Sequence, residues 1–225
     1  PIFNEENRLV NIFLDIKKFN KKIKYINKEY IFVDDGSIDK SKLILENFIK
    51  KNFNKKIDYR IVSCNKNKGK GYALKRGVNK SSKKWILTSD ADCSVSNFQL
   101  IEWLKKDYIS IKNKIYFSSR NHPSSKVKKI KIRELIGGLF RLFINMFFEV
   151  KISDTQCGFK LYSSLEGKKV FNKIKTNGYM HDLEIYLIAK KMMIDIKELP
   201  VNWKHKPEGK IRFLKDFVKI FFSLI

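Results

Sequence analysis

Cysteine is scarce in this chain, and its spacing excludes several kinds of site. The 225 residues include three cysteines, Cys64, Cys93 and Cys157, and no two of them form a Cys-x-x-Cys pair. A structural zinc site needs clustered cysteines or histidines, so none is expected. The odd number of thiols, one of them beside an acidic motif, is typical of a reducing compartment such as the cytosol.

Long uncharged apolar runs are also missing. The sequence has no signal peptide and no uncharged apolar stretch of the roughly 18 residues that a membrane span requires. It has no internal repeat or interdomain linker either, so we expect residues 1–225 to form a single domain. Because the chain starts at Pro1 in a loop-like stretch and stops at Ile225 in an apolar run, we expect sequence to be missing at both ends.

Acidic residues are outnumbered by basic ones. The chain has 48 lysines and arginines against 23 aspartates and glutamates, a net charge of +25, while a hydrophobic content of 43% is typical of a globular protein. This excess predicts attraction to a polyanion, such as nucleic acid, anionic lipid or a phosphorylated substrate. The basic residues are dispersed and no aromatic RNA-binding motif is present, so a nucleic-acid-binding domain is only a remote alternative.

What the chain does contain is two strand-like segments that end in carboxylates. Residues 85–88 have strand chemistry and lead into Asp90-Ala91-Asp92, and residues 30–33 lead into Asp34 and Asp35. Side chains spaced by two on an extended chain point the same way, so Asp90 and Asp92 can bind one Mg²⁺ or Mn²⁺ together with a substrate phosphate. Read alone, the same pair could equally be turn formers that cap the next helix.

Strand patterns alternate with helix patterns over the first half of the chain. The expected strands are 30–35, 57–63, 85–90 and 114–119, and the expected helices are 9–23, 41–53, 71–79 and 96–108. This alternation predicts βαβ units and an α/β fold with a mostly parallel sheet, whose carboxyl-terminal edge binds ligands. Further on, we expect a helix at 182–193 and a strand at 194–205 in which Pro200 marks an edge or a bulge.

The loop from Asn65 to Gly71 is basic and contains glycine. It is not a Rossmann fingerprint, because Leu74 occupies the third glycine position, and it is not a phosphate-binding P-loop. Its lysines, Lys68 and Lys70, could face a diphosphate, helped by N–H groups at the start of the following helix. A solvated basic turn is the alternative.

A third feature is the apolar stretch from Leu135 to Val150, which contains three polar residues, Arg141, Asn145 and Glu149. It is too short and too polar to span a bilayer comfortably. Basic residues between Lys126 and Arg133 favour a helix in the interface of an anionic membrane, at about 1 kcal/mol each. An ordinary core helix is the alternative. Residues 211–225 are also basic and amphipathic.

Taken together, the motifs describe a site for a nucleotide-diphosphate sugar. Their order resembles family-two glycosyltransferases with the A-type nucleotide-sugar fold. The matching segments are Pro1-x-x-Asn4-Glu5-Glu6, Val33-Asp34-Asp35-Gly36-Ser37, Asn67-Lys68-Gly69-Lys70-Gly71, Asp90-Ala91-Asp92 and Ser119-Arg120. Later segments, 154–160, 181–184 and 201–203, resemble the dolichyl-phosphate β-glucosyltransferases, of which the mannosyltransferases are close relatives. The resemblance implies a Rossmann-like sheet flanked by helices, with a first strand before Pro1.

The resemblance also implies an activity. It implies transfer of glucose from UDP-glucose to dolichyl or polyprenyl phosphate, with Mg²⁺ or Mn²⁺ as cofactor and no nucleic acid as partner. A GDP-mannose-dependent mannosyltransferase, or a family-two enzyme with a soluble acceptor, is the alternative. The expected location is an anionic membrane surface, with the catalytic domain on the cytosolic face of the endoplasmic reticulum or of a bacterial inner membrane.

Roles for single residues follow from the same resemblance. Asp34 and Asp35 would contact uridine, Lys68 the donor phosphates, and Asp90 and Asp92 the nucleotide and metal, with Asp92 the more direct ligand. Arg120 and His122 would meet the acceptor phosphate, and Asp154, Gln156 and Lys160 would line the sugar and acceptor pocket. Apart from the resemblance, Lys126 is well placed in the sequence to bind the same phosphate. Asp182 or Glu184 stands where the family often places a catalytic carboxylate. The catalytic candidates are therefore Asp92, Arg120, Asp154 and Asp182.

A phosphate acceptor simplifies the chemistry. The second pKa of a phosphomonoester lies near 6, so the acceptor is largely a dianion at pH 7 and needs no general base. The enzyme then mainly needs cations that hold the dianion against the donor. We expect in-line displacement with inversion and a β-linked product. Of the remaining residues, Cys93 and Cys157 are expected to be packing residues and not nucleophiles, the three tryptophans to lie in the core, and His181 to lie at the surface.

Overall fold

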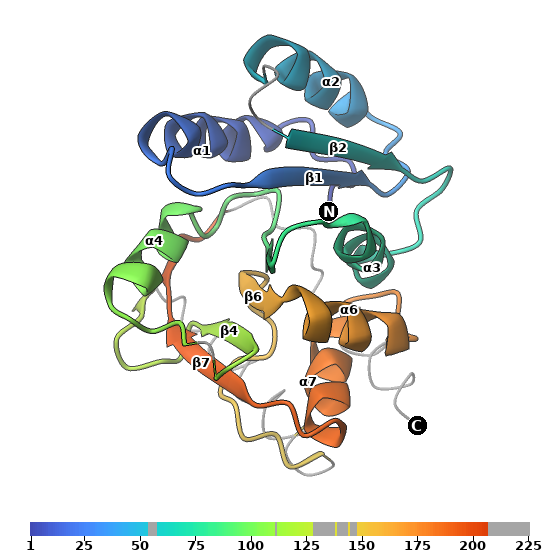
Figure 1. Ribbon diagram of the computed structural model, residues 1–225. Helices are drawn as coiled ribbons and strands as arrows, with labels where there is room; N and C mark the ends of the chain where they lie inside the picture. The colour runs from blue at the N-terminus through green and yellow to red at the C-terminus, as the bar shows by residue number, and fades with distance from the viewer. Residues whose placement is uncertain (54–57, 111, 128–137, 139–143, 145–147, 207–225) are drawn as a thin grey trace.

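The computed structural model describes residues 1–53, 58–110, 112–127, 138, 144 and 148–206 (Figure 1). Its helices are α1 (Leu9–Lys22), α2 (Ser41–Asn52), α3 (Lys70–Lys80), α4 (Phe98–Lys105), α6 (Ser164–Lys173) and α7 (His181–Lys191). Its strands are β1 (Glu29–Asp34), β2 (Asp58–Ser63), β3 (Trp85–Thr88), β4 (Ile115–Ser119), β5 (Lys126–Val127), β6 (Lys160–Ser163), β7 (Ile196–Pro200) and β8 (Asn202–Trp203). The predicted alternation of strands and helices is confirmed.

Helices cover both faces of the parallel pair β1–β2 (Figure 1). Successive side chains of a strand point to opposite faces, and β1 shows this clearly. Phe32 packs with Leu9 of α1 and Leu45 of α2, whereas Val33 packs with Ala73 of α3. Burial on both faces explains why this strand reads as a continuous apolar run.

A second sheet has the strand order β3-β6-β4-β7. β4 and β7 are parallel, but β6 runs antiparallel to both β3 and β4. The sequence did not predict this reversal. The connection from β4 to β6 extends from residue 120 to residue 159, long enough for β6 to enter the sheet in either direction.

The second sheet is also buried on both faces. Ile115 and Phe117 of β4 pack in one cluster with residues of α6 and α7. Tyr116 points the other way and packs with Trp103 of α4 and with Leu199 of β7. Trp103 is therefore a core residue, as predicted, whereas Trp85 is 36% exposed and is not.

Helix α6 was not predicted, although it has a clear start signal. Ser163 is its N-cap and accepts a hydrogen bond from the Glu166 amide, while its hydroxyl donates to the Glu166 carboxylate at 2.8 Å. This Ser-x-x-Glu pattern is the sequence signature of a capping box, although the Ser163 amide donates to Lys114 O at 2.7 Å and not to Glu166. The strand expected at 194–205 is instead two short strands, β7 and β8, separated at Val201. β7 lies at the edge of its sheet, as Pro200 predicted.

The predicted interface segment from Leu135 to Val150 lies mostly outside the described residues. Of its described members, Ile144 and Val150 are buried in the same cluster as α6 and α7, which favours the core alternative for these two positions. Residues 211–225 lie wholly outside the described part. Among the described helices, none combines the length and the apolar character needed to cross a bilayer.

A cavity of about 550 Å³ is lined by residues of both β1 and β3, including Tyr30–Val33 and Trp85–Thr88. At one end of this cavity, Ile2 forms a parallel bridge with Asp34. Its amide donates to Val33 O at 2.7 Å, and its carbonyl accepts from Asp35 N at 2.8 Å. β1 thus has a partner for part of the edge that faces away from β2.

Candidate active site

The carboxyl ends of β1 and β3 meet, as the strand-end argument predicts. Lys70 Nζ lies 2.6 Å from Asp90 Oδ1, and the neighbouring Gly69 amide donates to Asp35 Oδ2 at 2.7 Å. Arg8 Nη1 lies 3.9 Å from Asp92 Oδ2, at the start of the helix that follows Ile2. The acidic groups of the two strand ends therefore border one region and are not on unrelated surfaces.

Asp34 and Asp35 are both buried, with 2% exposure each, and their carboxylates bind backbone groups of the surrounding loops. Asp35 accepts hydrogen bonds from Asn67 Nδ2 at 2.8 Å and from the amides of Lys68 and Gly69. Asp34 Oδ1 accepts from the Ser37 amide at 3.2 Å. Asp35 thus holds the basic loop in place. The predicted uridine contact of the pair stays a prediction.

The two lysines of the basic loop have different surroundings. Lys68 is exposed, and its ammonium lies 4.6 Å from the Tyr72 ring centroid. Lys70 is turned toward Asp90. Burial lowers the pKa of Lys70, but the carboxylates of Asp90 and Asp182 outweigh burial and raise its pKa above the ordinary value. The sequence favoured Lys68 for the donor phosphates, whereas the structure places Lys70 against the acidic motif.

Asp90 and Asp92 offer hard oxygen ligands at accessible positions. Their side chains are 36% and 20% exposed, and Asp92 Oδ1 accepts from the Ser94 amide at 2.9 Å. Burial raises the pKa of Asp90, but Lys70 outweighs it and holds that pKa below its ordinary value. The described residues contain no group of three or more convergent metal-ligating side chains. Two carboxylates fit Mg²⁺ or Mn²⁺ whose other ligands are phosphate and water.

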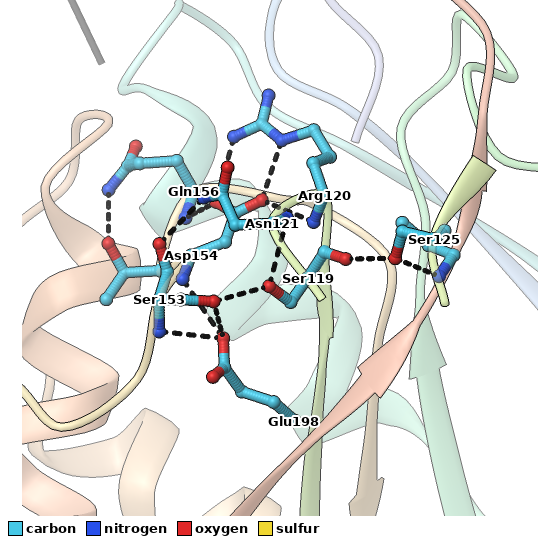
Figure 2. Close-up of polar contacts among 10 residues, drawn as sticks. Ser119, Arg120, Asn121, Ser125, Ser153, Asp154, Gln156 and Glu198 are labelled. Carbon is cyan, nitrogen blue, oxygen red and sulfur yellow. Dashed lines mark hydrogen bonds and ion pairs between the residues drawn. The ribbon is translucent and has the colours of Figure 1, made fainter. Parts of the chain in front are cut away.

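Arg120 and Asp154 form a bidentate ion pair (Figure 2). Arg120 Nε donates to Asp154 Oδ2 at 2.7 Å and Nη2 to Oδ1 at 2.9 Å, and the Arg120 amide donates to Oδ2 at 3.0 Å. Burial raises the pKa of Asp154, but Arg120 outweighs it and holds that pKa below its ordinary value. Arg120 Cζ also lies 5.8 Å from the centroid of the Trp203 ring, which is partly buried against the core cluster that contains Trp103.

Three more predicted acceptor-site residues lie on the same loops. The Gln156 amide donates to Asp154 Oδ1 at 3.0 Å. His122 is half-buried, and its Nδ1 accepts from the Ser124 amide at 3.1 Å. Lys126 begins β5 and is exposed. Their contacts with an acceptor stay predictions.

Lys160 and Asp182 are brought together, but in the interior. Lys160 is 1% exposed and donates to Asp182 Oδ1, which also lies 3.3 Å from His181 Nε2. The expectation that His181 lies at the surface is wrong, because its side chain is fully buried. Burial raises the pKa of Asp182, but His181 and Lys160 outweigh it and lower that pKa strongly. The ammonium of Lys160 faces Asp182, so its predicted contact with an acceptor is not visible here.

Glu184 has a different role from Asp182. Its carboxylate accepts hydrogen bonds from the amides of Lys175 at 2.9 Å and Thr176 at 2.8 Å, and so fixes the loop before α7. Asp182 differs from Glu184 in its electrostatic effect, because its charge raises the pKa of both Lys70 and Asp90.

The site also contains polar residues that the sequence analysis missed, among them Ser153 and Glu198 (Figure 2). Glu198 Oε1 accepts hydrogen bonds from the Ser153 amide and hydroxyl and from the Asp154 amide. A signal was present, since Glu198 stands shortly before the segment 201–203 that carries the resemblance.

Comparison with known proteins identifies the family of the chain. Residues 1–164 match the family model described as "Glycosyl transferase family 2". The chain is 31% identical to a dolichyl-phosphate beta-glucosyltransferase of Dictyostelium discoideum, over 100% of this chain and 73% of that protein. It is also 31% identical to one of Saccharomyces cerevisiae, over 100% of this chain and 71% of that protein.

Solved structures agree with the fold. A glucosyl-3-phosphoglycerate synthase of Mycobacterium tuberculosis has a TM-score of 0.68 at 15% identity, covering 99% of this chain and 77% of that one. A complex of the same enzyme contains Mn²⁺, UDP and glucosyl-3-phosphoglycerate, with a TM-score of 0.65, 15% identity and the same coverage. The predicted A-type fold is confirmed, and the chain belongs to glycosyl transferase family 2.

Proposed function

We propose that this glycosyltransferase moves glucose from UDP-glucose to dolichyl phosphate or another polyprenyl phosphate and inverts the anomeric carbon. The names of its full-length relatives support this proposal. The geometric observation that carries it is the meeting of the acidic motif with the segment that holds Arg120. A Cβ on Gly158 would lie 2.4 Å from Asp90 Oδ2. Gly158 belongs to the segment that begins at Asp154, the partner of Arg120.

The donor half-site is acidic. Asp90 and Asp92 would hold a divalent ion, which when bound neutralises charge on the departing diphosphate. Lys70 lies beside Asp90 and can contact the same diphosphate, while Asp35 holds the loop that carries it. The complexed M. tuberculosis synthase contains both Mn²⁺ and UDP, which supports this assignment.

The acceptor half-site contains the Arg120 guanidinium, held by Asp154. Arg120 would bind the phosphate of the acceptor, whose oxygen attacks C1 of glucose while the bond from C1 to the diphosphate breaks and UDP leaves. The acceptor is already a dianion at neutral pH, so no side chain has to remove a proton. The lowered pKa and buried ion pair of Asp182 make it a poor base, which agrees with this mechanism.

We also propose that the domain works at the cytosolic surface of an anionic membrane. A lipid-borne acceptor requires a membrane, and a net charge of +25 favours an anionic surface. Liposome flotation tests this part. Binding should rise with the fraction of anionic lipid and fall with salt, whereas binding that ignores both would contradict it.

A sugar-transfer assay tests the reaction. The chain is incubated with radiolabelled UDP-glucose or GDP-mannose, dolichyl phosphate and Mn²⁺, and the lipid product is analysed by NMR. We expect a β-glucosyl lipid from UDP-glucose only, and loss of transfer with a chelator. Asp92→Asn should lower the rate at least about tenfold, whereas Asp58→Asn, on the exposed end of β2, should not. An α-linked product, or mannose transfer alone, would contradict the proposal.

A further inference from the structure

Glu198 makes contacts that the proposed reaction does not yet use. It lies on β7, opposite Phe117 of β4 in the parallel register. A single oxygen, Oε1, accepts hydrogen bonds from the Ser153 amide at 2.8 Å, the Ser153 hydroxyl at 2.9 Å and the Asp154 amide at 3.0 Å (Figure 2). One carboxylate thus holds the backbone of the turn that carries Asp154.

This turn is also tied to the end of β4, where Arg120 follows. The hydroxyls of Ser119 and Ser153 lie 2.8 Å apart, and Asn121 Nδ2 donates to the Ser153 carbonyl at 2.8 Å. Arg120 lies between these two links and binds Asp154 through its amide and its guanidinium. Movement of the turn would therefore move the ion pair (Figure 2).

The segment 198–203 holds the other side of the Arg120 loop as well. Ser125 Oγ donates to the Ser119 carbonyl at 2.5 Å and accepts from the Val201 amide at 2.9 Å. The Trp203 ring faces the Arg120 guanidinium. Segment 198–203 thus restrains Arg120 in three ways. Glu198 binds the turn that carries Asp154, Val201 binds Ser125 of the Arg120 loop, and the Trp203 ring faces the guanidinium.

These contacts determine which edge of the Arg120 guanidinium is available to a ligand. Asp154 engages Nε and Nη2 of the guanidinium, so the Nη1 edge is the one that can face an incoming phosphate. Arginine recognises phosphate through the directions of its N–H groups, and a side chain held in the binding geometry loses less freedom on binding. The residues that hold Arg120 in this orientation should therefore affect its affinity for the phosphate.

We propose that Glu198 is a positioning residue for the acceptor phosphate, acting through the Ser153–Asp154 turn on Arg120. This proposal rests on the proposed role of Arg120 at the acceptor. Loss of Glu198 should weaken acceptor binding and leave donor binding unchanged, because the contacts of Glu198 are with the turn that orients Arg120 and not with the acidic motif.

The test compares Glu198→Ala with Glu198→Gln, whose side-chain oxygen can still accept the same hydrogen bonds. The acceptor is a short-chain prenyl phosphate, citronellyl phosphate, which avoids micelle effects. We expect Glu198→Ala to raise the acceptor KM at least about tenfold, with the UDP-glucose KM unchanged within about twofold. Glu198→Gln should restore most of the acceptor affinity. An unchanged acceptor KM in Glu198→Ala would overturn the proposal.

A matched control separates positioning from general stability. Ser163→Ala removes the N-cap of α6 and should lower Tm, yet leave both KM values unchanged. If Glu198→Ala does not accumulate as folded protein, Ser153→Ala removes one of the same links and should raise the acceptor KM in the same direction. No rise in Ser153→Ala would then count against the proposal.

Arg120→Lys distinguishes this proposal from the proposed function. If Arg120→Lys leaves the acceptor KM unchanged, the role of Arg120 at the acceptor is wrong. If it raises the acceptor KM and Glu198→Ala does not, the positioning role alone is wrong. Because Glu198 acts through Arg120, the double variant Arg120→Lys with Glu198→Ala should have nearly the same acceptor KM as Arg120→Lys alone. If the increases in acceptor KM of the two single variants multiply in the double variant, the proposal is overturned.

Discussion

Single side chains in the interior show that buried charge in this protein is paired. Lys160, Asp182 and His181 are almost fully excluded from solvent and share one carboxylate oxygen. Removal of one partner from such a group leaves an uncompensated charge, which is far more costly than loss of the whole pair. The cluster is therefore sensitive to single substitutions.

Asp182→Asn should lower the free energy of unfolding by about 3–5 kcal/mol, because Lys160 is left buried without its counter-charge. The double variant Asp182→Asn with Lys160→Met should be more stable than Asp182→Asn alone. Urea unfolding measures both. Asp58→Asn is the control, because the Asp58 carboxylate is 66% exposed, and it should change stability by less than about 0.5 kcal/mol. Additive losses in the double variant would contradict this account.

The close approach of Gly158 to Asp90 leads to a second prediction about a single residue. A Cβ on Gly158 would lie 2.4 Å from Asp90 Oδ2, so Gly158→Ala has to displace the Asp90 carboxylate. We expect weaker Mn²⁺-dependent UDP binding, by at least about tenfold, in titration calorimetry. Gly178→Ala is the matched control, since nothing lies within 4 Å of its Cβ. Equal affinities in the two variants would show that the close approach has no consequence for the donor.

The sequence predicted part of the candidate site. Asp34 and Asp90 follow strand-like runs, and the rule that strand ends meet at one edge was enough to bring them together. It did not distinguish Lys68 from Lys70, because both lie in one loop and only the fold decides which ammonium reaches Asp90. Glu198 was missed for a similar reason, since its partners are more than 40 residues away in the chain.

At the scale of elements, local signals were reliable and long-range pairing was not. The periodic apolar residues of α1 and the apolar run of β1 are local sequence patterns, so both elements were predicted. The antiparallel direction of β6 depends on how a connection from residue 120 to residue 159 returns to the sheet, which no local pattern encodes. Helix α6 could have been found, because Ser163 and Glu166 form a recognisable cap.

The cavity between β1 and β3 leads to a prediction about an element before Pro1. Ile2 already pairs with Asp34 in parallel, and a strand that continued backward from Ile2 would run along β1 and fill the cavity. We propose that a strand of about five residues completes the sheet there. Apolar side chains buried at roughly 1.5–3 kcal/mol each would exceed an ordering cost of roughly 1–2 kcal/mol per residue.

The measurement is thermal unfolding of the chain with a five-residue extension before Pro1. A β-branched, apolar extension should raise the free energy of unfolding by about 2 kcal/mol, because both faces of a central strand are buried. A Gly-Ser extension of equal length is the control and should leave it unchanged. Equal stabilisation by both would show that the cavity does not accept a strand.

The whole molecule combines a large positive charge with carboxyls whose pKa values are lowered by cations. Asp90, Asp154 and Asp182 all have a pKa below the ordinary value. A carboxyl of this kind stabilises the fold fully above about pH 5, and the contribution is lost as pH falls through about 4 toward the folded-state pKa. Acid also adds to the net charge of +25, so both effects favour unfolding.

We therefore expect the free energy of unfolding to be flat near neutral pH and to fall steeply below about pH 4. Urea unfolding at a series of pH values measures this. In the double variant of Asp182 and Lys160, the slope below pH 4 should be smaller by up to about 1.4 kcal/mol per pH unit, since one carboxyl no longer takes up a proton on unfolding. Stability that rises on acidification would contradict the assignment.

The contact between Lys70 and Asp90 has a consequence for ligand binding order. In the proposed donor site, a metal ion that arrives alone would have to compete with an ammonium group that already neutralises Asp90. When the nucleotide sugar arrives with the ion, the displaced ammonium gains the diphosphate as a new counter-charge. Each ligand should thus increase the affinity for the other, a reciprocal linkage that makes the loaded donor complex, and not the bare ion, the species the protein selects.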